Sequence, residues 1–149
     1  MLITKTIEID MGHRVTNHKS KCRNIHGHRY KIEVGVNDKV IIEEGASDEG
    51  MVIDFGDLKE IMMEVLDKGF DHGFVLWTKD PLFNDWIDSP LYDGLKIICV
   101  NFVPTAENLA KYWFELLLPK LNERKIKLQY VKIWETPTST AEFKWDDAL

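Results

Sequence analysis

Residues 26–42 read HGHRYKIEVGVNDKVII and determine how the chain folds. From Tyr30 to Asn37, apolar side chains occupy every second position, and charged or small residues stand between them. A period of two is typical of a strand with one buried face, so we expect a strand over 28–42. Residues 2–10 show the same alternation at Ile3, Ile7 and Ile9. They predict a neighbouring strand.

The rest of the chain predicts two helices and further strands. Asp54 is a suitable N-cap for a helix that ends near Gly69, and Thr105 for one that ends near Pro119. Apolar residues follow both caps at helical spacing. A short strand at Met51–Ile53 is expected to pair back onto 28–42. Other strands are expected at 95–102, 127–136 and 141–145, and the rest of 73–103 is mixed.

This order predicts an α+β fold with an antiparallel four-stranded sheet and both helices on one face. No repeat, low-complexity tract or linker divides the chain, so residues 1–149 are expected to form a single domain. If the opposite face of the sheet is apolar, a second subunit must cover it, which predicts a homo-oligomer.

Composition excludes several classes of protein. The 149 residues carry 19 Lys and Arg against 25 Asp and Glu, a net charge of −6, so the surface is expected to repel nucleic acid and acidic membranes. The start lacks the pattern of a secretion signal and no apolar run is long enough to span a bilayer, so we expect a cytoplasmic protein. Two cysteines cannot build a disulfide framework in a domain of this size.

Histidines cluster near the first predicted turn. Four of the five lie within sixteen positions, at 13, 18, 26 and 28. Alternate residues of a strand share a face, so His26 and His28 can converge on one ion, with His13 or His18 as the third ligand. Three imidazoles are typical of a catalytic Zn²⁺ site with an open position. The alternative is a set of hydrogen-bonded surface histidines.

Cys22 has two interpretations. Neighbouring cations favour its thiolate, so it could act as a base or nucleophile. It could instead be a fourth zinc ligand, which would make the metal structural. Between Met11 and Lys31 there are six cations and no acid, which suits a phosphate-bearing molecule or simply a solvated loop.

Three acidic residues stand out further along the chain. Asp71 precedes His72 and could fix the tautomer of its imidazole. Glu135 ends an apolar row, and its carboxylate suits the guanidine-like edge of an arginine, a pterin or a guanine. The helix dipole accounts for Glu107 without a ligand.

Five motifs together resemble one family. They occur in order as Cys22-Arg-Asn-Ile-His26-Gly-His28, Met51-Val-Ile-Asp54-Phe, Asp71-His72, Pro104-Thr-Ala-Glu-Asn108 and Glu135-Thr136. This series resembles the 6-pyruvoyltetrahydropterin and 6-carboxytetrahydropterin synthases over nearly the whole chain. The resemblance implies the tunnelling fold, in which subunits join their sheets into a barrel, commonly as a dimer of trimers.

The resemblance also implies roles for individual residues. His13, His26 and His28 would hold Zn²⁺, Cys22 would be the base, and Asp71 and His72 would tune proton transfer, from a different subunit if need be. Glu135 would anchor the pterin ring. Thr105 and the cations Arg14, Lys19, Lys21 and Arg23 would be further substrate-binding candidates.

The implied reaction converts 7,8-dihydroneopterin triphosphate to 6-carboxytetrahydropterin with release of acetaldehyde and triphosphate, on the way to queuosine. The three-residue gap between Cys22 and His26 resembles this carboxy-forming branch. The alternatives are a pyruvoyl-forming synthase and a non-catalytic, zinc-stabilised assembly module. Three features depart from the family pattern. Ile9-Asp10-Met11-Gly12 precedes His13, where the family often has Phe-x-Ala-Ala, and His18 is an additional nitrogen. The stretch 73–103 is long, with aromatic residues that suit either a lid or ordinary packing.

Overall fold

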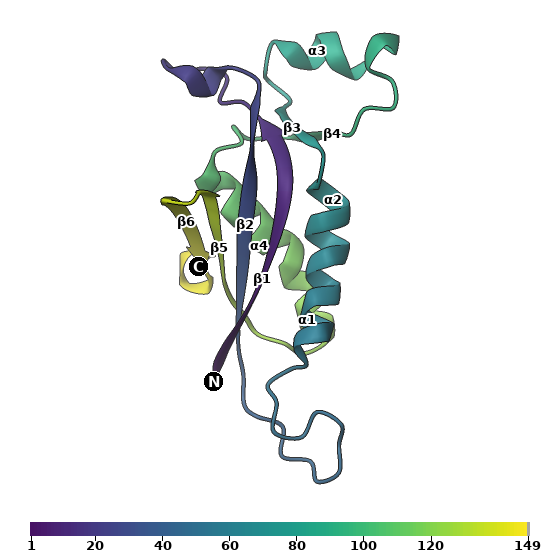
Figure 1. Ribbon diagram of the computed structural model, residues 1–149, viewed down its shortest axis with the longest axis vertical. Coiled ribbons are helices and arrows are strands. Elements are labelled where there is room, and N and C mark those ends of the chain that lie inside the picture. Colours follow the sequence, from purple (N-terminus) through teal and green to yellow (C-terminus); the bar gives the residue numbers. More distant parts are fainter. Residues whose placement is uncertain (149) are drawn as a thin grey trace.

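The computed structural model describes residues 1–148 and contains one mixed sheet of six strands (Figure 1). The spatial order is β4-β3-β1-β2-β5-β6. The strands are β1 (Leu2–His13), β2 (His26–Asn37), β3 (Phe74–Trp77), β4 (Ile97–Val100), β5 (Leu128–Thr136) and β6 (Ser139–Lys144).

The centre of the sheet is the antiparallel pair β1 and β2, matched from Leu2 opposite Asn37 to His13 opposite His26. β5 and β6 continue the sheet antiparallel on one side. On the other side β3 and β4 run parallel to β1. The α+β class is therefore confirmed, whereas the expected four antiparallel strands are replaced by six in a mixed sheet. β3 has only four residues, which is too short for a recognisable period, whereas β4 lies within the strand expected at 95–102.

Two long helical segments form the second layer. α1 (Phe55–Met62), the π-helical turn η2 (Met63–Asp67) and α2 (Lys68–Phe70) follow one another directly, and α4 spans Ala106–Glu123. The side chain of Asp54 accepts a hydrogen bond from Gly56 N and that of Thr105 from Asn108 N, so both predicted caps are present. α4 continues past Pro119, where an end was expected, because the buried side of the helix extends to Leu121.

Both long segments pack on the same face of the sheet, as predicted (Figure 1). The core lies between these layers. Trp113 and Phe114 of α4 are among its largest fully buried side chains. The sheet contributes Ile9, Met11, Tyr30, Ile32, Val34, Val131 and Ile133.

The opposite face of the sheet is polar. A partner subunit was expected to cover this face only if the face were apolar, and that condition is not met. Register places Glu8 opposite Lys31, Asp10 opposite Arg29, and Lys132 opposite Glu142 on that face. Charged pairs of this kind are stable in water. The unpaired edges of β4 and β6 remain as the feature that favours assembly.

Short elements occupy the two ends of the molecule. η1 (Lys21–Arg23), α3 (Leu82–Ile87) and η3 (Pro90–Tyr92) lie near one end (Figure 1), while η4 (Trp145–Ala148) closes the described chain. At the other end β2 stops at Asn37 rather than 42, and no strand forms at 51–53. Ile41 N instead donates to Met51 O at 2.8 Å within an exposed loop, where apolar residues such as Ile42 find no packing partner. Within residues 1–148, no helix combines the length and apolar character needed to cross a membrane.

Candidate metal centre and active site

The paired ends of β1 and β2 bring three imidazoles together. His13 lies opposite His26, and His28 lies opposite Met11, so the alternation of the strands turns all three rings to the helix-covered face. One nitrogen of each ring lies within 4.8 Å of the others. His13 is 1% exposed. The structure thus selects His13, which the spacing alone left open against His18.

Two backbone carbonyls orient the rings. His13 Nδ1 lies 2.7 Å from Pro104 O, and His26 Nδ1 lies 2.7 Å from Asn24 O. A carbonyl oxygen only accepts, so each Nδ1 carries the proton and each Nε2 is left with a free lone pair. Burial lowers the pKa of His13 and of His28, which favours the neutral form that binds metals. Three such nitrogens fit Zn²⁺.

Cys22 lies outside this group of ligand atoms. It is half-buried in η1, which belongs to the connection from β1 to β2. With His13, His18 and Glu135 it lines a cavity of about 240 Å³, which also includes Thr105 and Glu107. His18 is exposed, and its Nδ1 accepts a hydrogen bond from Ser20 N at 3.0 Å. The thiol therefore shares a cavity with His13 but does not belong to the group of three imidazoles.

Glu135 reaches the same cavity from the end of β5. The hydroxyl of Tyr30 donates to Glu135 Oε1 at 3.3 Å and lies 3.3 Å from His13 Nε2. Tyr30 is fully buried, which raises the pKa of its phenol, so this group stays protonated. Glu135 is thus a partly exposed carboxylate held 3.6 Å from His13 Nε2.

Glu107 is a residue whose position the sequence did not reveal. It stands in the first turn of α4, and a dipole argument explains it there without any ligand. In the structure it lines the cavity that holds Cys22 and Glu135. The one available signal was the Thr105 cap two residues earlier, because the first residues of a helix lie next to the site that its N-terminus faces.

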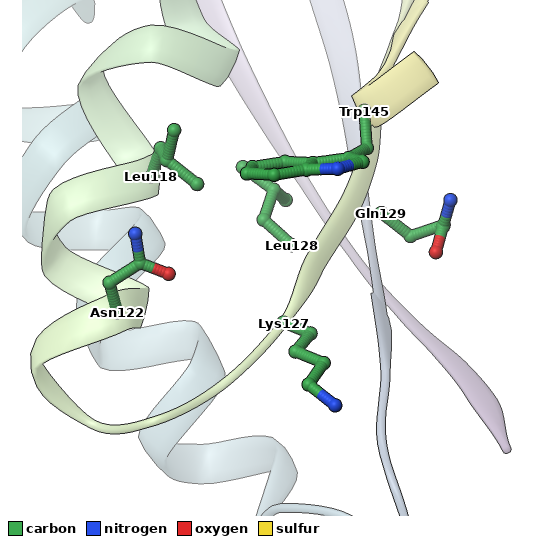
Figure 2. Close-up of a pocket in the computed structure, with 6 residues that line it drawn as sticks. All are labelled: Leu118, Asn122, Lys127, Leu128, Gln129 and Trp145. Carbon is green, nitrogen blue, oxygen red and sulfur yellow. The ribbon is translucent and has the colours of Figure 1, made fainter. Parts of the chain in front are cut away.

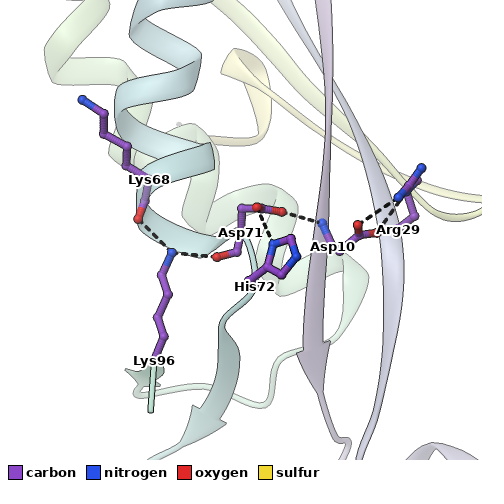
Figure 3. A network of polar contacts seen from close by, with 6 residues as sticks. All are labelled: Asp10, Arg29, Lys68, Asp71, His72 and Lys96. Carbon is purple, nitrogen blue, oxygen red and sulfur yellow. Dashed lines mark hydrogen bonds and ion pairs between the residues drawn. The ribbon is translucent and has the colours of Figure 1, made fainter. Parts of the chain in front are cut away.

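Asp71 and His72 form a separate group at the end of α2, shown in Figure 3. Asp71 Oδ2 lies 2.6 Å from His72 Nδ1, and Asp71 Oδ1 accepts from Asp10 N at 2.9 Å. These two hydrogen bonds lower the pKa of the Asp71 carboxyl. His72 adopts the left-handed conformation with φ 56°, and its side chain is 80% exposed.

Two cations extend the Asp71 group. The Lys96 ammonium donates to Lys68 O at 2.9 Å and to Asp71 O at 2.8 Å, which caps the free carbonyls at the helix end. Arg29 pairs with Asp10 through two hydrogen bonds of 3.0 and 2.9 Å. His72 and Arg29 line a cavity of about 460 Å³ with His28. Cys22 and His72 of one chain therefore line different cavities, and one of the three grouped histidines borders each.

The candidate phosphate-binding cations separate into two kinds. Arg14 Nε lies 3.0 Å from the buried Asp80 Oδ2, so its charge is already paired. Lys19, Lys21 and Arg23 are exposed on the connection between β1 and β2, and none takes part in an ion pair among the described residues. These three remain available to an anion.

A further cavity lies away from the histidines, between the end of α4 and β5 (Figure 2). Its volume is about 290 Å³, and Trp145 lies beside Leu128 in its wall, with Leu118 on the helix side. No residue singled out for chemistry lines it. The cavity is the gap left where the C-terminal turn folds back over the sheet.

Comparison with protein families identifies one match. A model described as 6-pyruvoyl tetrahydropterin synthase matches residues 2–146. Among curated proteins, the 6-carboxy-5,6,7,8-tetrahydropterin synthase of Rickettsia bellii is 36% identical over 93% of this chain and 96% of its own. The enzyme of that name from Aquifex aeolicus is 35% identical over 95% of this chain and 96% of its own.

Solved structures agree with this match. An uncharacterised protein of Wolinella succinogenes superposes with a TM-score of 0.80 at 26% identity, covering 97% of this chain and 98% of its own. The 6-pyruvoyl tetrahydropterin synthase of Caenorhabditis elegans gives a TM-score of 0.67 at 28% identity, covering 97% of this chain and 94% of its own.

Proposed function

The chain belongs to the 6-pyruvoyl tetrahydropterin synthase family, and from that membership we propose that it is a zinc-dependent lyase of the carboxy-forming branch. Its substrate would be 7,8-dihydroneopterin triphosphate, and its products 6-carboxytetrahydropterin, acetaldehyde and triphosphate. The observation that carries the proposal is the cavity in which His13, Cys22 and Glu135 meet. The relatives at 35–36% identity bear the carboxy-forming name, which favours that branch over the pyruvoyl-forming one.

The metal would be held by His13, His26 and His28. Bound there, Zn²⁺ would polarise oxygen atoms of the substrate side chain and make neighbouring protons more acidic. The protein's part is to present three neutral imidazoles, two of them fixed by carbonyls.

Glu135 would bind the pterin ring. A carboxylate accepts two parallel hydrogen bonds from the adjacent N–H groups of the ring, and such charge-assisted pairs give both energy and orientation. Tyr30 supports this role because its buried hydroxyl holds Glu135 Oε1 in place. Thr105 and Glu107 of the same cavity are further polar groups for the ring.

Cys22 would remove a proton from the substrate side chain, and Asp71 with His72 would return or relay protons. The thiol supports this role because it lines the same cavity as His13 and lies outside the group of three imidazoles. Asp71 fixes the tautomer of His72, since the carboxylate accepts the Nδ1 proton. A neighbouring subunit would supply the second pair, because in one chain the two groups line different cavities. Lys19, Lys21 and Arg23 would receive the triphosphate.

The identity of the reaction products tests the proposal. The zinc-loaded protein is incubated with 7,8-dihydroneopterin triphosphate, and the pterin product and acetaldehyde are measured by mass spectrometry. Acetaldehyde with 6-carboxytetrahydropterin is the expected result. Triphosphate loss with a pyruvoyl product would move the protein to the other branch, and a zinc-loaded protein without turnover would make it an assembly module.

A further inference from the structure

Asp80 is the only buried acidic residue among residues 1–148. It follows β3 by three residues and is 3% exposed, with a fully buried carboxylate. Burying a carboxylate is costly unless donors surround it. Its partners therefore show what the group holds in place.

The Asp80 carboxylate joins two segments of the chain. Oδ1 accepts a hydrogen bond from Leu82 N at 2.9 Å, at the start of α3. Oδ2 accepts a hydrogen bond from the hydroxyl of Thr16 and faces Arg14 Nε at 3.0 Å. Arg14 and Thr16 begin the connection from β1 to β2, so one buried group ties that connection to the segment between β3 and β4.

The residue between these two partners contacts the proposed base. Val15 N donates to Cys22 O at 2.9 Å, and Val15 O accepts from His18 N at 3.0 Å. Residues 17–21 of the connection are exposed. Val15 thus links the main chain of Cys22 to the body of the protein, and the residues on both sides of Val15 are held by Asp80.

From this chain of contacts we propose that Asp80 is a positioning residue for Cys22. It acts through Arg14, Thr16 and Val15 and has no contact with the thiol in the structure. The inference deepens the proposed function and rests on it, because it concerns the group that would remove the substrate proton. It also gives the long segment 73–103 a role as the support of the Cys22 connection.

The test uses a Cys99→Ser parent, in which Cys22 is the only remaining thiol. Asp80→Asn in this parent keeps the shape of the side chain and removes its charge. We expect kcat to fall about tenfold, because small displacements of a reacting group are costly, while KM changes less than about twofold. Alkylation of Cys22 by iodoacetamide, followed by mass spectrometry on the zinc-loaded protein, should be several-fold faster, and zinc content should be unchanged.

Asp85→Asn is the matched control. Asp85 lies on α3, is exposed and has no polar contact among the described residues, so the same substitution there should change neither alkylation nor kcat. If Asp80→Asn folds poorly, Thr16→Val tests the same link by removing one donor while Arg14 stays paired. Alkylation and kcat equal to the parent in the folded variants would overturn the proposal, as would loss of zinc together with activity.

The two proposals fail separately. A parent without turnover of 7,8-dihydroneopterin triphosphate would end the proposed function. The alkylation rates of Asp80→Asn and Asp85→Asn would still decide whether Asp80 positions Cys22.

Discussion

His13 shows how much one side chain connects in this molecule. Its Nδ1 is held by Pro104 O, just before α4, and its Nε2 faces Tyr30 and Glu135. The ring, which β1 carries, therefore contacts β2, β5 and the segment just before α4. Its place at the end of β1 sets the position of the candidate metal centre.

The zinc content of two variants distinguishes the proposed role of Cys22 from that of His26. Cys22→Ala should abolish turnover and leave about one zinc per chain, because the thiol lies outside the group of imidazoles. His26→Ala should lose zinc and activity together. Zinc is measured by atomic absorption on both purified variants. Zinc loss in Cys22→Ala would show that the thiol is a ligand rather than a base.

The Asp71 carboxyl should titrate at a lower pH than an ordinary aspartate. Hydrogen bonds from Asp10 N and from the His72 ring lower its pKa below the ordinary 3.8. A carboxyl with a lowered folded-state pKa stabilises the fold above its unfolded pKa, and this contribution is lost as the pH falls through the lower folded value. The side-chain carboxyl carbon is followed by NMR.

The matched variant for this titration is His72→Ala, which removes one of the two hydrogen bonds and leaves Asp10 N in place. Its midpoint should move part of the way back toward the ordinary value. A wild-type midpoint at or above 3.8 would contradict the described contacts.

At the scale of elements, two glycines are expected to respond oppositely to alanine. Gly35 lies opposite Tyr130, and an added Cβ would stand 2.2 Å from Tyr130 Cε1. Tyr130 cannot easily move, since its hydroxyl donates to Glu33 at 2.7 Å. Gly35→Ala should therefore cost about 1–3 kcal/mol.

Gly69→Ala is the control, because Gly69 is helical and a Cβ there meets nothing within 4 Å. It should stabilise by about 0.4–1 kcal/mol. Thermal unfolding at one protein concentration compares both variants with the wild type. Equal melting temperatures for the two would refute the described packing of β2 on β5.

The sequence predicted elements with a clear period and missed those without one. β1, β2, β5 and both long helices have enough residues for alternation or an apolar stripe to show. β3 was missed because its four residues lie deep in the sheet with no polar alternation. The expected strand at 51–53 was wrong because residues 38–50 are too exposed to bring it back to the sheet.

The same distinction applies to the candidate site, where local spacing could be predicted and tertiary contacts could not. The spacing of His26 and His28 predicted a pair on one face, since two positions along a strand fix direction. The partners of His13 could not be predicted, because Pro104 and Tyr30 meet it only through the tertiary fold. For the same reason the sequence could not show that Arg14 is paired, because its partner Asp80 lies sixty-six positions later in the chain.

At the scale of the whole molecule, the distribution of groups predicts that an active site needs two chains. Cys22→Ala and His72→Ala should each be inactive alone. When the two variants are unfolded and refolded together in equal amounts, about one quarter of the activity should return. Each shared site has a one-half chance of an intact Cys22 from one chain and a one-half chance of an intact His72 from the other. Activity is measured before and after mixing. No recovery, with mixed oligomers shown by mass spectrometry, would place the complete site in one chain.

The continuous pairing of β1 with β2 has a consequence for biosynthesis. All three imidazoles are translated by residue 28, and the partner strands are adjacent in the chain. Local hairpins form quickly and domains begin to fold from the N-terminus as they leave the ribosome. The nascent chain therefore carries the three histidines of the candidate metal centre before Pro104 exists to orient His13, and Glu135 arrives last. Translation therefore adds the proposed metal ligands first, the carbonyl that orients His13 next, and the proposed ring anchor last.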